Sequence, residues 1–268
     1  MALPEPGESS TALVTGASSG IGAAIARELA ERGQNLTLVA RREELLTDLA
    51  TEVHDRHGVR AGVFACDLGD DDERARLEAR IGELGLQVEI LVNNAGFGYT
   101  GDFADAERQR QVDMVKLNCE AVVDLSARFL PDMVRRGRGG VLNVASTGGF
   151  QPMPKSATYG ASKAFVLSHS EAVHHELRGT GVTLTALCPG PVRTDFADAA
   201  GIPKANETGP GFIWTSVEDV AREAVDGLAS GKRVVVPGLL NHAGSLLGRH
   251  SPRWLALPLT SRIWQQVE

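Results

Sequence analysis

The chain has 268 residues, of which 43% are hydrophobic and 23% are charged. This length and composition allow one large domain or two small ones, with a substantial core. The formal net charge of −7 argues against a general attraction to nucleic acid or to an anionic membrane surface, although a single basic pocket for an anionic ligand stays open.

Other features favour a cytoplasmic protein. No apolar run approaches the ~18 residues of a membrane span. The start of the chain, MALPEPGESS, lacks the basic residues and apolar stretch of a secretory signal. Three cysteines, Cys66, Cys119 and Cys188, are widely spaced in apolar runs. We expect reduced core thiols, and neither a disulfide framework nor a metal site.

Short apolar runs of β type alternate with helical patterns along most of the chain. Strands are expected at 11–15, 35–40, 61–65, 88–93, 140–145, 182–187 and 232–237. Helices are expected at 21–31, about 43–57, roughly 106–136 and 157–178. Apolar strands joined by helices predict a parallel sheet covered on both faces, which is a doubly wound, Rossmann-like α/β fold.

A glycine-rich stretch, TGASSGIG at 15–22, follows the first strand and opens the next helix. Glycine permits a positive φ and the close approach of a phosphate or ribose, and a helix N-terminus attracts anions. The spacing is Gly-x-x-x-Gly-x-Gly rather than the usual Gly-x-Gly-x-x-Gly. A tight turn packed on a helix is the alternative, but the place after the first strand favours a dinucleotide site.

Two later strands end in groups that suit the same ligand. Asp67 follows the third strand and could accept the adenine amino group, while Asn93–Gly96 follow the fourth. Ligands of open α/β sheets lie beyond the carboxyl ends of the strands, so these motifs meet at one edge. Each of them could also simply form a turn.

Tyr159 precedes Lys163 by four residues, so the two side chains share one face of a predicted helix. An amphipathic helix with one aromatic residue and one solvated charge would show the same spacing. The pair therefore carries weight only together with the other motifs.

The combined motifs resemble the short-chain dehydrogenase/reductase family over roughly residues 10–240. The matching residues are Thr15-Gly16-x-x-x-Gly20-x-Gly22, Asn93-Asn94-Ala95-Gly96, Asn118, Ser146, Tyr159-x-x-x-Lys163 and Pro189-Gly190. The resemblance implies one Rossmann-like domain with a parallel sheet of about seven strands. It also implies an oxidoreductase that transfers hydride between a nicotinamide cofactor and a ketone or secondary alcohol, needs no metal, and forms a homodimer or homotetramer.

The resemblance also assigns roles to residues. Ser146 and Tyr159 would polarise and protonate a carbonyl, and Lys163 would hold the nicotinamide ribose. Lys163 would also lower the tyrosine pKa from ~10 by about three units, which requires roughly 4 kcal/mol. Asn118 would support a water path from Lys163, although local bonding inside a helix is its alternative. The expected cofactor contacts are Gly16, Ser18, Ser19, Gly20, Ile21, Gly22, Arg41, Arg42, Asp67, Leu68, Asn94, Ala95, Gly96, Tyr159, Lys163, Pro189, Gly190, Val192 and Thr194.

The end of the second strand bears on the choice of cofactor. Ala40 is followed by Arg41 and Arg42, and no acidic residue stands there to grip the ribose hydroxyls of NAD. Arg41 offers a planar cation for a 2′-phosphate, and Arg42 could assist. Two solvated arginines at a helix start are the alternative. We expect NADP(H) to be preferred, with NAD(H) still possible.

Two segments interrupt the alternation of strands and helices. Residues 193–216 contain glycines, prolines and the apolar Phe196, Phe212 and Trp214, which suits a substrate-covering lid or, equally, a pinned surface connection. Residues 241–268 mix apolar and basic side chains divided by prolines, and we expect this tail to pack on the domain or at a subunit interface. Pocket closure and membrane contact are alternatives. The expected organisation is a flexible tail over 1–10, a Rossmann-like catalytic domain over 11–240 and the apolar tail over 241–268.

The ARREELL stretch at 40–46 and the tail are similar to actinobacterial NADP(H)-dependent ketone and 3-oxoacyl reductases. This similarity implies a hydrophobic keto substrate, although a sugar, steroid or xenobiotic ketone stays open. A catalytically idle dinucleotide-binding regulator or scaffold is the alternative function, and the four catalytic candidates disfavour it.

His169, His174 and His175 fall on one predicted helix without the His-Glu-x-x-His spacing, so no metal is expected.

Overall fold

The computed structural model describes residues 2–194, 214–252, 254 and 257–258. Most of the predicted lid and the end of the predicted tail lie outside these residues. The strands are β1 Ser10–Thr15, β2 Leu36–Ala40, β3 Ala61–Ala65, β4 Gln87–Asn93, β5 Gly139–Val144, β6 Val182–Leu187 and β7 Val234–Val235. The helices are α1 Gly20–Glu31, α2 Glu43–His57, α3 Asp71–Glu83, α4 Arg108–Val115, α5 Ala121–Arg136, α6 Ala157–Glu176, α8 Val217–Ala229 and α9 Leu239–His250. Three short turns complete the order, namely the 3-10 turns η1 Phe103–Asp105 and η3 Thr147–Phe150 and the π turn η2 Lys116–Glu120.

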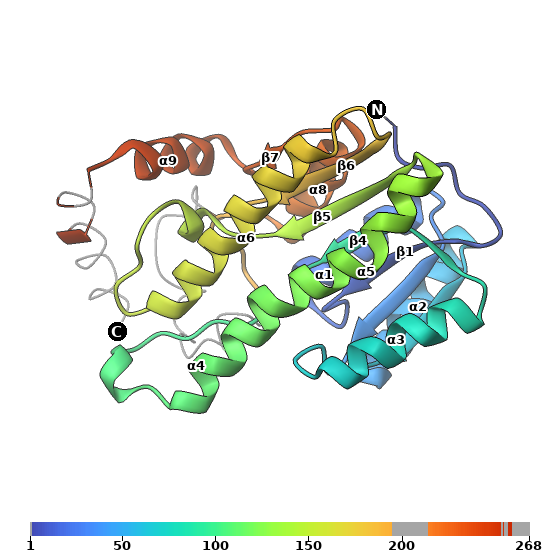
Figure 1. The fold of residues 1–268 in the computed structure, drawn as a ribbon, viewed down its shortest axis with the longest axis horizontal. Helices are drawn as coiled ribbons and strands as arrows, with labels where there is room; N and C mark the ends of the chain where they lie inside the picture. The colour runs from blue at the N-terminus through green and yellow to red at the C-terminus, as the bar shows by residue number, and fades with distance from the viewer. Residues whose placement is uncertain (1, 195–213, 253, 255–256, 259–268) are drawn as a thin grey trace.

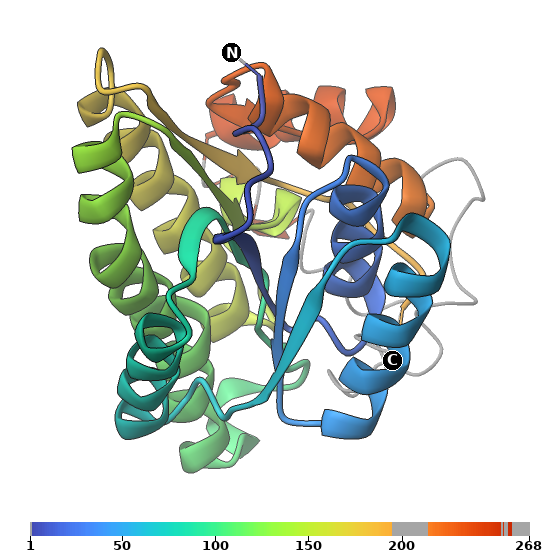
Figure 2. The same ribbon diagram turned by 90° about the vertical axis from the view of Figure 1, so that its right-hand side faces the viewer.

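The seven strands form one parallel sheet in the order β3-β2-β1-β4-β5-β6-β7. Helices α1, α2 and α8 cover one face, and α3, α5 and α6 cover the other (Figures 1 and 2). The predicted doubly wound, Rossmann-like fold is therefore confirmed as a single α/β domain. Its order reverses between β1 and β4, which is where such sheets place their ligands.

Each central strand is apolar on both faces because helices cover both sides of the sheet. Leu13 and Val14 are adjacent in β1, and both are fully buried. Alternation along the strand sends Leu13 into the core with Leu125 of α5, and Val14 into the core with Ile25 of α1. Continuous apolar runs were therefore the correct signal for these strands.

Helices α3 and α8 begin at side-chain caps. The Asp70 carboxylate accepts from the Glu73 amide at 3.0 Å, and the Ser216 hydroxyl accepts from the Asp219 amide at 3.0 Å. Such caps satisfy amide groups that the first helical turn leaves without partners. No helix in the described part of the chain is long and apolar enough to cross a bilayer.

Several elements differ from the sequence prediction, and α3 and α8 were not among the helices expected. The long helix predicted over roughly 106–136 is α4 and α5 joined by the π turn. The last strand is only two residues long, where six were predicted. Helix α9 runs from Leu239 to His250, across the expected start of the tail at residue 241.

Candidate active site

The glycine-rich turn after β1 packs closely against the loop after β4. Gly16 has a φ of +63°, and a Cβ on it would lie 2.7 Å from Asn94 Nδ2. A Cβ on Gly22 would collide with the Gly16 carbonyl and the same amide. The Asn94 amide donates to the carbonyls of Thr15 at 2.9 Å and Gly16 at 3.3 Å. These glycines are therefore required for packing the two loops, whatever ligand approaches them.

The Thr15 hydroxyl joins the two loops a second time. It donates to the Val92 carbonyl at 3.0 Å and accepts from the amides of Asn94 at 2.9 Å and Ala95 at 3.1 Å. Thr15 is the first residue of the predicted motif, which assigned it no role. The available signal for such a role was a hydroxyl at the end of a strand predicted to be buried, because a buried hydroxyl needs hydrogen-bond partners.

The N-terminus of α1 is arranged to receive an anion. Its N-cap, Ser19, makes no side-chain cap hydrogen bond, and the first turn holds no acidic residue. Arg42 Nη2 donates to the hydroxyls of Ser18 and Ser19, both at 3.0 Å. A cation beside amides at a helix N-terminus is the donor set that a phosphate needs. Both Arg41 and Arg42 are exposed, and it is Arg42 that lies on the turn.

The loop after β3 reaches the same edge of the sheet. Asp67 accepts from the Gly69 amide at 2.9 Å, and its own amide donates to Glu73 at 2.5 Å. Leu68 is buried, and its carbonyl accepts from Arg74 Nη1 at 2.7 Å. The backbone at Asp67 and Leu68 is therefore fixed by hydrogen bonds at the carboxyl edge of the sheet.

The loop after β6 carries the last of the predicted cofactor contacts along the chain. The Thr147 amide donates to the Pro189 carbonyl at 2.9 Å, and Val192 forms a parallel bridge with Thr215. Thr194 Cγ2 lies 3.3 Å from where a Gly20 Cβ would stand. This loop thus connects the turn after β5 with the glycine-rich turn.

Helix α9 packs against this region. Asn241 lies against Gly190, and its amide donates to Thr215 Oγ1 at 3.3 Å. Gly248 lies beside Gln151, just beyond η3. The described part of the tail therefore borders the predicted active site (Figure 1).

Ser146 and Tyr159 meet beyond the end of β5. Ser146 caps η3, where its hydroxyl accepts from the Gly148 amide at 3.1 Å. Tyr159 lies in the first turn of α6 and is hydrogen-bonded to Ser146. The structure therefore brings Ser146 and Tyr159 together, as the predicted roles of this pair require.

Lys163 lies one turn further along α6 and is only 5% exposed. Its Nζ donates to the Val144 carbonyl at 2.8 Å and stands 5.9 Å from the centre of the Tyr159 ring. Burial lowers the pKa of Lys163 from 10.5 to about 8. The ammonium has three donors, of which the Val144 carbonyl takes one.

The prediction that Lys163 lowers the pKa of Tyr159 is wrong for this structure. Burial raises the pKa of the tyrosine, and the hydrogen bond from Ser146 is what opposes that rise. Removal from water favours the neutral form of an acid and of a base alike, so burial moves the two pKa values in opposite directions. The side chains are close, but solvation rather than their mutual charge decides the direction.

Asn118 lies in the π turn and is 1% exposed. Its Oδ1 accepts from the Phe97 amide at 3.1 Å, and its Nδ2 donates to the Phe97 carbonyl at 3.0 Å and to Ser162 Oγ at 3.1 Å. Ser162, which sequence analysis missed, donates in turn to the Tyr159 carbonyl at 2.7 Å. Asn118 therefore bonds to other segments rather than within its own helix, and π turns are frequent at functional sites.

Gly96 lies between Asn118 and Lys163, because a Cβ on it would stand 2.8 Å from Asn118 Oδ1 and 3.6 Å from Lys163 Nζ.

The three histidines of α6 make contacts outside this group. His174 Nδ1 bonds to the Leu184 carbonyl, and His169 stacks on Phe165. The described residues contain no group of three or more side chains placed to hold a metal ion.

Comparison with known proteins agrees with this geometry. Residues 10–204 match the short chain dehydrogenase family. A very-long-chain 3-oxoacyl-CoA reductase of Anas platyrhynchos is 37% identical over 197 residues, which cover 72% of this chain and 62% of the duck protein. The chain thus spans less than two thirds of that relative.

Solved structures give the same result. A short-chain dehydrogenase from Sphingobium yanoikuyae in complex with NADPH superposes with a TM-score of 0.80 at 32% identity, covering 96% of this chain and 95% of that one. A variant of the actinorhodin polyketide ketoreductase with NADPH superposes with a TM-score of 0.76 at 32% identity, covering 88% and 98%. From the family match over most of its length and the fold it shares with solved members, the chain belongs to the short chain dehydrogenase family.

Proposed function

We propose that the protein is an NADP(H)-dependent ketone reductase, reversible as a secondary-alcohol dehydrogenase, that acts on a hydrophobic or 3-oxoacyl-type substrate. One observation carries the proposal. Ser146 and Tyr159 are hydrogen-bonded to each other beside a buried Lys163, at the carboxyl edge of a doubly wound sheet. A nucleotide-binding protein without catalysis has no need of this arrangement.

Each side chain has a part in the reduction. Ser146 donates a hydrogen bond to the carbonyl oxygen and keeps its proton, which stabilises the charge that develops there. Tyr159 gives its proton to the same oxygen, and its raised pKa keeps the phenol protonated at neutral pH. When bound, the nicotinamide supplies the hydride. Lys163 would hold the ribose of the cofactor, and Asn118 holds the loop at Phe97 against α6.

The preference for NADP(H) is supported by the end of β2. Arg42, together with Ser18 and Ser19, forms a cluster of donors suited to a phosphate, and no carboxylate follows Ala40 directly. The Sphingobium and actinorhodin proteins were both solved with NADPH.

The substrate class is supported by the relatives and by the surroundings of the site. The relatives include 3-oxoacyl-CoA reductases, a polyketide ketoreductase and a bulky-bulky ketone specific alcohol dehydrogenase from Comamonas testosteroni. In this chain, α9 contacts η3 and carries the exposed Leu240 and Leu247. Apolar side chains at this place suit a ketone that carries a long or bulky hydrocarbon group. A cytoplasmic location and a homodimeric or homotetrameric state stay predictions.

The test is a nicotinamide absorbance assay with NADPH and NADH against a panel of ketones. The panel includes 3-oxoacyl thioesters of increasing chain length and bulky aryl ketones. Tyr159→Phe removes one hydroxyl and is expected to lower turnover by a factor of about 100 or more. The matched control is Tyr99→Phe, because Tyr99 is the other tyrosine of the chain.

NADPH turnover that depends on Tyr159 and not on Tyr99 would support the proposal, and the optimum chain length would define the pocket. Equal turnover by the two variants would contradict the role of Tyr159. Binding of NADPH without turnover of any ketone would favour the idle dinucleotide-binding protein.

A further inference from the structure

Helix α3 buries an arginine where its amphipathic pattern calls for an apolar residue. Its buried residues are Arg74, Leu77 and Ile81, which follow each other at three and four residues along one face. The side chain of Arg74 is 1% exposed. A buried guanidinium requires charged or polar partners, so the contacts of Arg74 indicate what it is there to hold.

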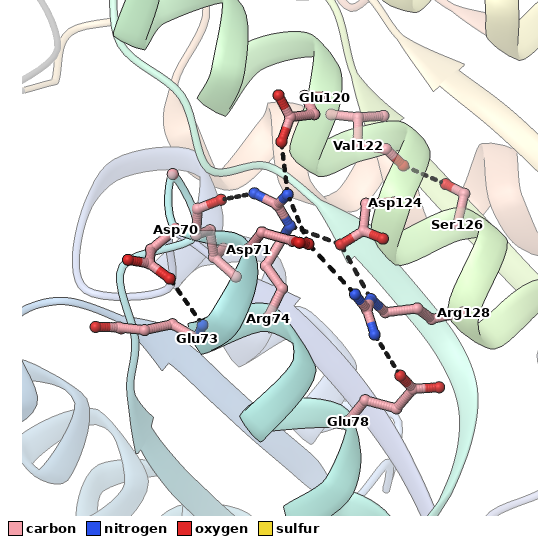
Figure 3. A network of polar contacts seen from close by, with 12 residues as sticks. Asp70, Asp71, Glu73, Arg74, Glu78, Glu120, Val122, Asp124, Ser126 and Arg128 are labelled. Carbon is pink, nitrogen blue, oxygen red and sulfur yellow. Dashed lines mark hydrogen bonds and ion pairs between the residues drawn. The ribbon is translucent and has the colours of Figure 1, made fainter.

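Arg74 contacts three different segments (Figure 3). Nη1 donates to the Leu68 carbonyl at 2.7 Å, Nη2 donates to Glu120 Oε1 at 2.7 Å, and Nε donates to Asp124 Oδ2 at 2.6 Å. Nη2 also pairs with Asp71 at 3.3 Å, on its own helix. The planar fork of the guanidinium fixes the directions of these bonds, and a lysine could not reproduce them.

The segments that Arg74 joins belong to two separate parts of the proposed site. Leu68 lies in the loop after β3, which sequence analysis assigned to the adenine. Glu120 is the last residue of the π turn, and Asn118 is two residues before it in the same turn. Asp124 follows in the first turn of α5. One buried cation therefore connects the adenine loop to the turn that presents Asn118.

We propose that Arg74 is a positioning residue, which holds the loop at Asp67–Leu68 and the π turn of Asn118 in a fixed relation to each other. This inference rests on the proposed function, which gives the loop at Asp67–Leu68 a part in binding the cofactor and Asn118 a part in holding the loop at Phe97 against α6. Arg74 touches neither substrate nor reacting atoms, and it acts through Leu68 and Asn118.

Packing alone does not account for this arginine. An apolar side chain would complete the buried face with Leu77 and Ile81, and exchanging a buried ion network for apolar residues is often neutral or stabilising. The carboxylates of Glu120 and Asp124 are 54% and 24% exposed, so water can solvate them without Arg74. What an apolar residue cannot replace is the set of directed bonds to Leu68 and Glu120.

Arg128 provides the matched control within the same network. It lies on α5 and donates to Asp124 at 3.0 Å and to Glu78 at 2.5 Å. Its described contacts include neither Leu68 nor Glu120. Replacing Arg128 therefore removes a similar charge from the same two helices and leaves the connection between the two segments intact.

The experiment compares Arg74→Met, Arg74→Lys and Arg128→Met in the full chain by two readouts. Amide hydrogen exchange is measured over residues 66–70 and 116–121 without ligand, and NADPH affinity is measured by fluorescence titration without ketone. For Arg74→Met we expect faster exchange in both segments and an NADPH Kd raised about tenfold, which is typical for the loss of charged hydrogen bonds in a network. Arg74→Lys is expected to show a smaller change of the same kind. Arg128→Met should leave both quantities within about twofold of the wild type.

Wild-type exchange in both segments of Arg74→Met would overturn the proposal, and so would an equal effect of Arg128→Met. If Arg74→Met does not fold, Arg74→Lys is compared with Arg128→Met by the same criteria. Failure of the wild-type protein to bind NADPH would contradict the proposed function instead, and the exchange comparison would still decide the role of Arg74.

Discussion

Replacing Lys163 with methionine should make the protein more resistant to unfolding at neutral pH, and the difference should disappear in alkali. Lys163 is 5% exposed, and burial lowers its pKa from 10.5 to about 8. A shift of one pKa unit corresponds to about 1.4 kcal/mol, so keeping the charge of Lys163 inside the fold at pH 7 lowers the free energy of unfolding by roughly 3 kcal/mol.

The sign follows from the protons bound in each state. Between pH 8 and 10.5 the unfolded lysine holds a proton that the folded lysine has released, so the free energy of unfolding of the wild type rises with pH across this window. Methionine has no such dependence. The advantage of Lys163→Met is thus present in full below about pH 8 and mostly gone by pH 10. Loss of the bond to the Val144 carbonyl subtracts about 1 kcal/mol at every pH.

Urea unfolding of both proteins at pH 7 and pH 10 measures this dependence. The difference in free energy of unfolding between variant and wild type should fall by about 2–3 kcal/mol from the lower to the higher pH. Lys232→Met, at an exposed lysine, is the control and should show almost no change between the two pH values. A pH-independent difference for Lys163→Met would refute the reasoning, because it would mean that the buried ammonium is not destabilised.

Three further predictions concern the site. Because burial raises the pKa of Tyr159, the rate of alcohol oxidation, which uses the tyrosinate, should rise into the alkaline range, while the rate of ketone reduction stays level through neutrality. Initial rates measured in both directions against pH test this. A reduction rate that already falls with increasing pH below pH 7 would contradict it. Arg42→Ala should weaken NADPH binding about tenfold and leave NADH binding almost unchanged, which titration with each cofactor measures. Gly22→Ala should cost about 1–3 kcal/mol of stability in urea unfolding, because its Cβ would collide with backbone, whereas Gly82→Ala meets open space in α3 and should be neutral or stabilising.

The strands were the most predictable part of the fold. β3 and β6 begin and end at the predicted residues, because their apolar runs are bounded by turn residues. β7 is shorter than predicted because only Val234 and Val235 pair with β6, at the edge of the sheet. Pro237 has no amide to donate to the ladder, which favours an early end.

Helix α9 was not predicted because the prolines at 252 and 258 suggested short pieces. In the structure the helix starts after Gly238, whose φ of +83° turns the chain, and it ends at His250 before either proline. The prolines therefore limit the helix without interrupting it.

For the site, the motifs predicted which side chains are needed, but not their contacts. Arg42 rather than Arg41 lies on the glycine-rich turn, because Arg42 is the N-cap of α2 and points back to Ser18 and Ser19. Arg74 is the one charged residue on the apolar face of α3. Recognising it requires the phase of that helix, which a strongly charged sequence such as DDERARLEAR does not reveal.

The π turn has a consequence for the number of residues in this part of the chain. A regular α-helix from Arg108 to Arg136 would close each turn with a bond from residue i to i−4, but here the Ala121 amide bonds to the Lys116 carbonyl, five residues back. The segment thus holds one residue more than a straight helix of the same length. Deleting one residue between Asn118 and Ala121 would leave an unbroken helix with regular hydrogen bonds. It would rotate Asn118 and everything before it by about 100° relative to α5. Asn118 would then face away from Phe97 and Ser162, so the site depends on a count of residues as much as on their identity.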